Sequence, residues 1–268
     1  MTHELPRLFV VMVLSNYGVF LNEMLQALAA QTDSRFELRL IDNGLSDASM
    51  QPVIEAAPTV PMLHNPRPRG WGAVWDQAAQ LAARWGSAHD KYLCLLSPDT
   101  FPAPECFEQV VAWMDAHDDV AMASPILLHL FEEHGSDEAW QERVESDYVA
   151  SAGLAWTRPW RLRNSNIGKR LSDLPSEPFD GDAVAPGCVL VRLSALKESF
   201  DVGMTSPVAM VEAARRMRSN GGRCVVVQGA IAYRYSGRYQ PNMTDRVMRE
   251  MDRRELLRVA WRRWRGII

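Results

Sequence analysis

Residues 92–100 read Tyr-Leu-Cys-Leu-Leu-Ser-Pro-Asp-Thr, an apolar run that passes directly into a proline and a carboxylate. The first five residues are typical of a strand that is buried on both faces of a parallel sheet. Pro98 stops the strand because proline has no N–H for the ladder, and Asp99 follows at its carboxyl end. Ligands bind at that edge of open α/β sheets. The stretch therefore predicts an α/β sheet with Asp99 at its ligand-binding edge.

The chain on both sides of this strand alternates between strand and helix patterns. Strands are predicted at 8–14, 36–41, 60–63 and 120–123, a short helix after Ser46, and helices at 19–31, 73–85 and 104–117. Loops of a few residues join these elements. The alternation predicts a doubly wound, mostly parallel sheet flanked by helices and linked by right-handed crossovers.

The pattern weakens after residue 125, and residues 125–181 are polar and give no regular element. Further strands are predicted at 188–191, 223–227 and 230–235, and a helix at 206–220 with Ser206 as N-cap and Pro207 at its first position. Residues 244–268 read as an arginine-rich helix. We expect one domain at 1–243, with halves at about 1–125 and 126–243, and a helical tail at 244–268.

Composition limits the class of protein and its partners. A chain of 268 residues with 47% hydrophobic content can bury a sizeable core, and a net charge of -4 argues against a nucleic-acid partner. The four cysteines lack metal-type spacing and suggest free thiols in a reducing compartment. The apolar run at 8–14 is short for a signal peptide, so we expect a cytoplasmic protein.

The C-terminal helix allows two interpretations. Leu257, Trp261, Trp264 and Ile268 fall on one stripe among arginines. A basic amphipathic helix with tryptophans can lie on the anionic inner face of a membrane. The same stripe could instead dock on the domain and leave the arginines in solvent.

Four segments, in this order, resemble family-2 glycosyltransferases of the GT-A type, and within them the rhamnosyltransferase-like branch: VVMVLSNYG, FELRLIDNGLSDAS, NPRPRGWGAVWDQA and YLCLLSPDT. The resemblance covers about residues 8–125 and resumes more weakly over 182–196 and 200–227. It implies a GT-A fold and transfer of a deoxyhexose such as rhamnose, or a hexose, from a nucleotide-diphosphate donor. The implied acceptor is a saccharide or lipid-linked glycan of cell-surface polysaccharide synthesis, and the transfer inverts the anomeric carbon.

The resemblance also implies a donor site. Asn16 lies in a loop that borders the nucleotide in such enzymes, and Asp42 matches a carboxylate that accepts a hydrogen bond from the nucleobase. Gly70 and Trp71 match a Gly-aromatic-Gly segment beside the donor, and Asp76, where relatives carry Asn, would face the sugar. The residues themselves leave alternatives open, since Asp42 also suits a turn and Asp76 a first-turn carboxylate favoured by the helix dipole.

Asp99 matches the acid of the Asn-Pro-Asp-Thr variant of the DxD motif. In relatives this acid holds Mg²⁺ or Mn²⁺, which neutralises the leaving diphosphate as a Lewis acid. Ser97 stands here in place of the first acid. Arg234 stands where relatives often place a His, and an arginine fork suits phosphate. We therefore keep two hypotheses, a metal on Asp99 and a metal-independent site in which Arg234 supplies part of the neutralisation.

The sequence departs from the family at the catalytic base. Ala209 and Met210 stand where relatives carry an acidic pair at the start of a helix. Glu212, almost one turn further on, and Asp182, which matches a family Asp, are the candidate bases. Glu212 equally suits an ordinary acid on the helix surface. The missing pair keeps a second function open, a catalytically impaired GT-A domain that acts as a nucleotide-sugar-binding or partner-binding subunit.

Overall fold

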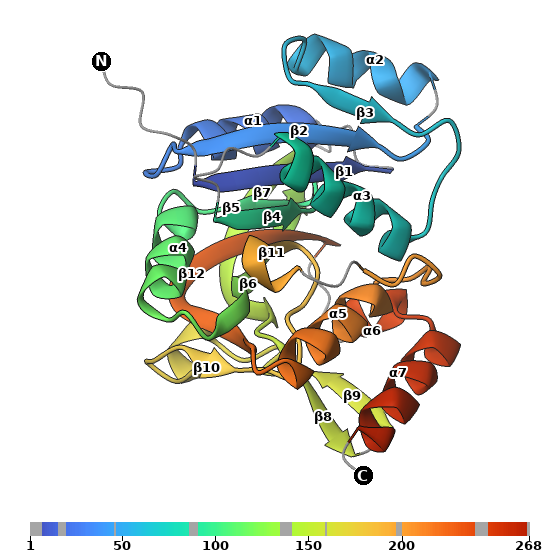
Figure 1. Cartoon of the computed structure of the whole chain (residues 1–268). Helices are drawn as coiled ribbons and strands as arrows, with labels where there is room; N and C mark the ends of the chain where they lie inside the picture. The colour runs from blue at the N-terminus through green and yellow to red at the C-terminus, as the bar shows by residue number, and fades with distance from the viewer. Residues whose placement is uncertain are drawn as a thin grey trace.

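A computed structural model describes residues 7–15, 20–45, 47–85, 91–134, 141–158, 160–196, 200–238 and 246–266 (Figure 1). One large sheet forms the centre, with strand order β10-β12-β6-β11-β4-β1-β2-β3. These strands are β1 (Leu8–Leu14), β2 (Phe36–Asp42), β3 (Met62–His64), β4 (Tyr92–Leu96), β6 (Val120–His134), β10 (Phe179–Asp180), β11 (Cys188–Arg192) and β12 (Arg223–Arg238). Off this path, β5 (Thr100–Pro102) pairs with β12, and β7 (Gln141–Ser151) pairs with β6.

The sheet is mostly parallel, as the strand–helix alternation predicts. β1 pairs in parallel with β2 and β4, β2 with β3, and β6 with β12. β11 runs antiparallel between β4 and β6. A separate two-stranded sheet contains β8 (Leu154–Arg158) and β9 (Arg161–Asn164). The sheet thus brings the carboxyl ends of β1, β2 and β4 to one edge.

The helices of the described chain are α1 (Leu21–Ala29), α2 (Asp47–Ala56), α3 (Trp71–Trp85), α4 (Cys106–Ala116), α5 (Val208–Ser219), α6 (Arg246–Glu250) and α7 (Arg253–Arg265). In Figure 1, α3 and α5 lie in front of the sheet, and α7 lies beside α5 near β8 and β9. None of the helices in the described residues is both long and apolar enough to cross a bilayer.

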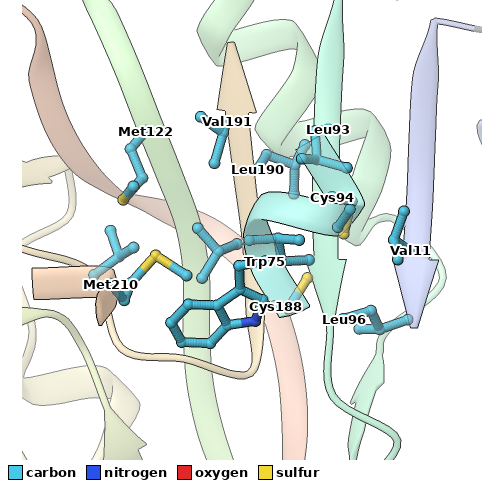
Figure 2. Close-up of a cluster of buried hydrophobic side chains, with 14 of the residues drawn as sticks. Val11, Trp75, Leu93, Cys94, Leu96, Met122, Cys188, Leu190, Val191 and Met210 are labelled. Atoms are coloured by element: carbon cyan, nitrogen blue, oxygen red, sulfur yellow. The ribbon is translucent and has the colours of Figure 1, made fainter. Parts of the chain in front are cut away.

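The buried core explains why the sequence folds this way. Every residue of β1 is buried, as expected for a strand covered on both faces. Figure 2 shows Trp75 of α3 and Met210 of α5 packed over strand residues such as Leu96 and Cys188. All four cysteines (Cys94, Cys106, Cys188 and Cys224) are buried free thiols, and burial raises the pKa of Cys224 to about 12.

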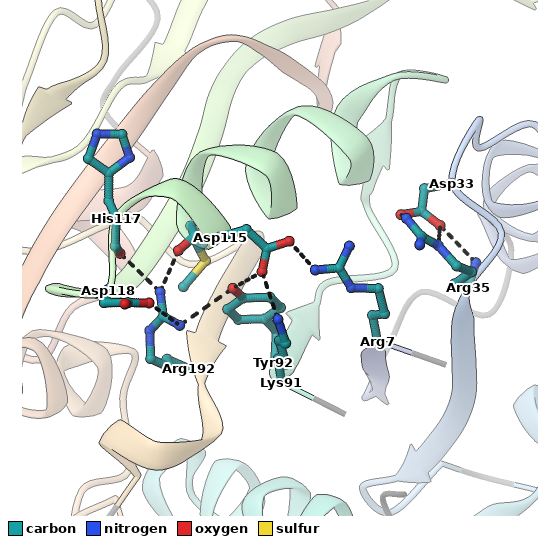
Figure 3. Close-up of polar contacts among 10 residues, drawn as sticks. Arg7, Asp33, Arg35, Lys91, Tyr92, Asp115, His117, Asp118 and Arg192 are labelled. Atoms are coloured by element: carbon teal, nitrogen blue, oxygen red, sulfur yellow. Dashed lines mark hydrogen bonds and ion pairs between the residues drawn. The ribbon is translucent and has the colours of Figure 1, made fainter. Parts of the chain in front are cut away.

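Polar contacts fix the amino end of the sheet, away from the edge where ligands are expected (Figure 3). The Asp115 carboxylate of α4 accepts a hydrogen bond from the Tyr92 hydroxyl at 2.8 Å and forms an ion pair with Arg7. Arg192 at the end of β11 donates to the carbonyls of Val120 and His117, both at 3.0 Å. These bonds tie the C-terminal end of α4 to the starts of the central strands.

The structure differs from the predicted elements in several places, among them the tail, where the single predicted helix is divided into α6 and α7. Residues 125–181, for which no regular element is predicted, continue β6 to His134 and add β7, β8 and β9. The two short strands predicted at 223–235 are one strand, β12, whose register shifts between Val227 and Ile231. The helix predicted at 206–220 begins at Val208 with Pro207 as its N-cap residue, and the Ser206 hydroxyl donates to Glu255 while it accepts from Val208 N–H at 3.3 Å.

Candidate functional site

A cavity of about 400 Å³ opens at the carboxyl ends of β1 and β4. Residues from both halves of the chain line it: Val13, Ser15, Trp71, Trp75, Leu95, Leu96, Ser97, Pro98, Asp99, Pro186, Gly187, Val189, Thr205, Ser206, Pro207, Met210, Arg234, Arg246 and Glu250. Its position agrees with the sheet edge at which the sequence places a ligand. The lining combines an apolar floor with four charged side chains, two carboxylates and two guanidinium groups.

Asp99 lies in this lining and is almost fully buried, with 1% of its surface exposed. The turn after β4 holds it, since Thr100 N–H donates to the Ser97 carbonyl at 3.1 Å and Tyr235 N–H to the Asp99 carbonyl at 2.9 Å. The Ser97 hydroxyl donates to Asp99 Oδ1 at 2.5 Å. Two guanidinium groups face the other oxygen, Oδ2, with Arg246 Nη2 at 2.9 Å and Arg234 Nε at 3.9 Å.

The two arginines are linked by a second carboxylate, Glu250 of α6. Arg246 Nε donates to Glu250 Oε1 at 2.7 Å, and Arg234 Nη2 donates to Glu250 Oε2 at 3.3 Å. Arg234 also donates to the Pro186 carbonyl at 3.2 Å. Asp99, Arg234, Arg246 and Glu250 therefore form a closed charge cluster, which we call the arginine–carboxylate cluster. Its side chains differ in exposure, from 1% for Asp99 to 36% for Glu250.

His129 lies next to this cluster without adding charge to it. Burial, together with the positive charge of Arg234, lowers its pKa to about 4. The imidazole is therefore neutral at pH 7 and shares a 2.7 Å hydrogen bond with the Ser236 hydroxyl. The permanent cations of the cavity wall are the guanidinium groups.

A divalent cation would need oxygen ligands with free lone pairs. Asp99 Oδ1 already accepts from hydroxyls. Its Oδ2 makes no hydrogen bond within the described residues, but it faces two cations. Across the described ranges, no three His, Cys, Asp or Glu side chains converge in a metal-binding arrangement. The two guanidinium groups beside Asp99 disfavour a divalent cation there, so of the two hypotheses the described residues favour the metal-independent one.

The other predicted donor residues are only partly brought together. Trp71 and Arg234 line the cavity with Asp99, whereas Asn16 lies outside the described residues. Asp42 is fully buried at the end of β2, where its Oδ1 accepts from Gly44 N–H at 3.0 Å and Leu45 N–H at 2.8 Å. Its other oxygen pairs with His64. Asp42 therefore fixes its own turn and is absent from the cavity lining.

Asp76 also lies outside the lining, and it accepts a hydrogen bond from Gln80 one turn along α3 at 2.7 Å. Gly70 and Gly72 have a packing role. A Cβ on Gly70 would lie 2.8 Å from Thr205 Cα, and one on Gly72 would lie 2.0 Å from the Asp201 carbonyl oxygen. Gly72 N–H donates to the Met204 carbonyl at 2.9 Å. These glycines let the start of α3 approach the 201–205 segment.

Glu212, one of the two candidate bases, is not an ordinary surface acid. Its side chain is 1% exposed and accepts from Arg215 Nε at 2.8 Å, Arg216 Nε at 3.1 Å and Arg262 Nη1 at 3.0 Å. Burial alone would raise the pKa of this carboxyl, but the guanidinium groups outweigh it and the pKa is lowered. Glu212 is absent from the cavity lining, where Met210 stands instead.

Asp182, the other candidate base, also lies outside the lining. Its Oδ2 accepts from Trp156 N–H at 2.8 Å, and its Oδ1 lies 3.7 Å from both Arg218 and Arg263. Its contacts join β8 to α5 and α7.

Sequence reasoning missed Arg246 and Glu250, which reach the cavity from α6. Their spacing of four residues predicts an ion pair on one helix face, and the structure contains that pair. Nothing in the local pattern says that this face returns to Asp99, more than a hundred residues earlier in the chain.

α7 secures this C-terminal segment to the domain. Glu255 Oε1 accepts from Thr205 N–H at 2.7 Å and its hydroxyl at 2.9 Å, and Oε2 accepts from Ser206 N–H at 3.1 Å and its hydroxyl at 2.7 Å. Val259 and Ala260 are buried. Thr205 and Ser206 line the cavity, so the docking of α7 bears directly on the site.

Comparisons with known proteins agree with this geometry. Residues 9–199 match the family model described as glycosyl transferase family 2, and no curated protein matches the chain. The chain is similar to a crystal structure of GalNAc-T7 with UDP, GalNAc and Mn²⁺, at 16% identity and a TM-score of 0.63, over 87% of this chain and 44% of that one.

A second similar structure is the mannosyltransferase PcManGT from Pyrobaculum calidifontis in complex with GDP-Man and Mn²⁺. Its identity is 13% and its TM-score 0.57, over 86% of this chain and 57% of that one. The chain spans about half the length of these two structures, and at such identities they show the shared GT-A fold alone. Because the family model covers most of the chain, this protein belongs to glycosyl transferase family 2.

Proposed function

We propose that this protein transfers a sugar from a nucleotide-diphosphate donor to a hydroxyl acceptor, with the donor in the cavity beside Asp99. One observation carries the proposal: two guanidinium groups, Arg234 and Arg246, stand in a partly apolar cavity at the carboxyl edge of a GT-A sheet. A guanidinium fork pairs with phosphate oxygens through two parallel hydrogen bonds. The family and the solved neighbours, one with UDP and one with GDP-Man, support a nucleotide donor.

The cavity offers contacts for the rest of the donor. Trp71 lies 5.2 Å from Trp75, centroid to centroid, and both rings line the cavity. An aromatic face can stack on a base or on the C–H face of a sugar ring. Asn16, Asp42 and Asp76 remain proposed donor residues on the strength of the resemblance. For Asp42 this requires the nucleobase to reach a carboxylate that already holds a turn.

We propose direct displacement with inversion, in which a carboxylate takes the acceptor proton as the diphosphate leaves. Glu250 is the better-placed base within the described residues, because it lines the cavity and is partly open to solvent. Binding of the donor phosphates to Arg234 and Arg246 would release Glu250 from its ion pairs and make it a stronger base. Glu212 and Asp182 are the weaker alternatives.

The finer assignments follow the family resemblance. We propose a deoxyhexose such as rhamnose, or a hexose, as the transferred sugar, and a saccharide or lipid-linked glycan of the cell surface as the acceptor. A cytoplasmic protein that contacts the inner face of the membrane suits a lipid-linked acceptor. Trp160, Trp261 and Trp264, which we call the tryptophan patch, are each more than 40% exposed and offer such a contact.

Thermal-shift screening against UDP, dTDP and GDP sugars, followed by assays of donor hydrolysis and transfer, tests this function. We expect one nucleotide series to stabilise the protein and its sugar to be released slowly by water. No stabilisation by any of these nucleotides would contradict the proposal.

The second candidate is a catalytically impaired GT-A subunit that binds a nucleotide sugar or a partner enzyme. Met210 in the lining, where relatives carry an acid, favours it. Tight nucleotide binding without hydrolysis or transfer to any acceptor would support this candidate instead.

A further inference from the structure

We infer that Arg234 and Arg246 hold the donor diphosphate without a divalent cation, and that Asp99 is the residue that positions both guanidinium groups. This inference rests on the proposed function and names how its donor site works. It reverses the role that the DxD-type position has in relatives, since Asp99 would hold arginines in place of a metal.

The first argument is the coordination of Asp99. Its side chain is 1% exposed, with one oxygen bound by the Ser97 hydroxyl and the other facing Arg246 at 2.9 Å. A metal bound to Oδ2 would have to displace a guanidinium group that is itself linked to Glu250. A dication would also lie within a few ångströms of the Arg234 charge, which disfavours it.

The second argument concerns Arg234, which occupies a position that the register of the sheet fixes. Arg234 pairs with Thr100 across β12 and β5, directly after Asp99. Its side chain is 6% exposed, and its buried Nε makes no hydrogen bond within the described chain. A buried N–H without a hydrogen bond is costly, and a phosphate oxygen in the cavity would satisfy it.

The third argument is the origin of Arg246. It lies on α6, and α7 ties this segment to Thr205 and Ser206 of the cavity wall through Glu255. The second cation therefore comes from the C-terminal segment, which is secured independently of Asp99. Glu250 balances the arginines in the absence of donor and, at 36% exposure, has room to turn toward solvent when phosphate replaces it.

The test is nucleoside-diphosphate binding by calorimetry, with UDP, GDP and dTDP, in EDTA and in Mn²⁺. We expect the Kd of the bound nucleotide to differ by less than about twofold between the two conditions. Arg246→Gln and Arg234→Gln should each weaken binding in EDTA by about 10- to 100-fold, as expected when a charged hydrogen-bonding group is lost. Arg246→Lys should fall between Arg246→Gln and the wild type, because the charge remains and the fork is lost.

Arg258→Gln is the matched control, because this arginine is exposed on α7 and absent from the cavity lining. Its Kd should equal that of the wild type. Circular dichroism and urea unfolding show whether each variant is folded, and Mn²⁺ electron paramagnetic resonance, read with and without nucleotide, should show no metal bound by the protein.

Binding that disappears in EDTA and returns with Mn²⁺ would overturn the inference and leave the proposed function standing. A folded Arg246→Gln protein that binds as tightly as Arg258→Gln would also overturn it. Failure of all three nucleotides to bind in either condition would overturn the proposed function and this inference together.

Discussion

Glu250 and Asp99 are the two carboxylates of the cavity lining, and solvent reaches only the first of them to any extent, with 36% against 1% exposure. An acceptor hydroxyl must contact the base that takes its proton. We expect Glu250→Gln to lower kcat about 10²- to 10⁴-fold without weakening donor binding, measured by steady-state kinetics and calorimetry.

Asp182→Asn serves as the control for this prediction, since Asp182 lies outside the lining. With Glu250 as the base, the kcat of Asp182→Asn should stay within about twofold of the wild type. A loss of kcat in Asp182→Asn as large as in Glu250→Gln would assign the base to Asp182.

The close packing of Gly72 leads to a prediction about stability. An added Cβ would meet the Asp201 carbonyl oxygen at 2.0 Å, and a backbone atom cannot move aside cheaply. Gly72→Ala should destabilise the fold by about 1–3 kcal/mol, read from urea unfolding. Gly266→Ala, whose Cβ would meet nothing closer than 3.6 Å, should be nearly neutral. Equal stability of the two variants would contradict the packing role of Gly72.

The candidate site could be predicted only in part, for reasons visible in single residues. Asp99 could be predicted because a buried strand and a proline place it at a sheet edge. Arg234 could be predicted because it stands where relatives often place a His and its guanidinium fork suits phosphate. Asp42 matches the family's acid after the second strand, yet its carboxylate binds its own turn and His64. Arg246 could not be predicted, because its role depends on how a distant helix docks.

At the scale of elements, the docking of α7 depends on one carboxylate. Burial alone would raise the pKa of Glu255, but hydrogen bonds from Thr205 and Ser206 outweigh it and the pKa is lowered. A carboxyl whose pKa is lower in the folded than in the unfolded protein stabilises the fold at every pH above its unfolded pKa, which is near 4.5 for Glu255. This stabilisation disappears as the pH falls through the pKa of the folded protein.

We therefore expect Glu255→Gln to destabilise the protein by roughly 1–3 kcal/mol at pH 7. The difference from the wild type should shrink as the pH falls below about 4.5. Urea midpoints measured from pH 7 to pH 3 test this, with Glu55→Gln on the exposed side of α2 as control. A difference that stays constant over this range would show that the ionised carboxylate is not the stabilising form.

Helices and strands could be predicted where the pattern of apolar residues was unambiguous. The bounds of β1 and β4 match the prediction residue for residue, because a strand covered on both faces is an unbroken apolar run. β7, β8 and β9 were not predicted. An antiparallel strand with one face in solvent alternates apolar and polar residues, and this gives a weaker strand signal than an unbroken apolar run. Gly229, with a φ of +94°, interrupts β12, and a glycine in a strand looks like a turn from sequence alone.

For the whole molecule, the tryptophan patch makes the membrane proposal testable. Trp261 and Trp264 of α7 lie 5.5 Å apart, centroid to centroid, and Trp160 lies 6.4 Å from each. The guanidinium of Arg265 lies 4.7 Å from the Trp261 ring. Aromatic rings beside cations suit the boundary of an anionic bilayer.

We expect the protein to sediment with phosphatidylserine-containing vesicles, and the double variant Trp261→Ser, Trp264→Ser to bind at least about tenfold more weakly. Ile54→Ser is the control, because Ile54 is similarly exposed on α2, far from α7 in Figure 1. Wild-type protein that stays in the supernatant with anionic vesicles would contradict a membrane contact through this patch.

The four buried thiols give the molecule an internal reporter of its own opening. Because Cys94, Cys106, Cys188 and Cys224 are all enclosed and the thiolate is the reactive form, an alkylating reagent should modify them only in molecules whose sheet has come apart. The labelling rate in native buffer then measures how often the core opens. A bound nucleotide should slow that labelling rate even if it does not change the circular dichroism spectrum.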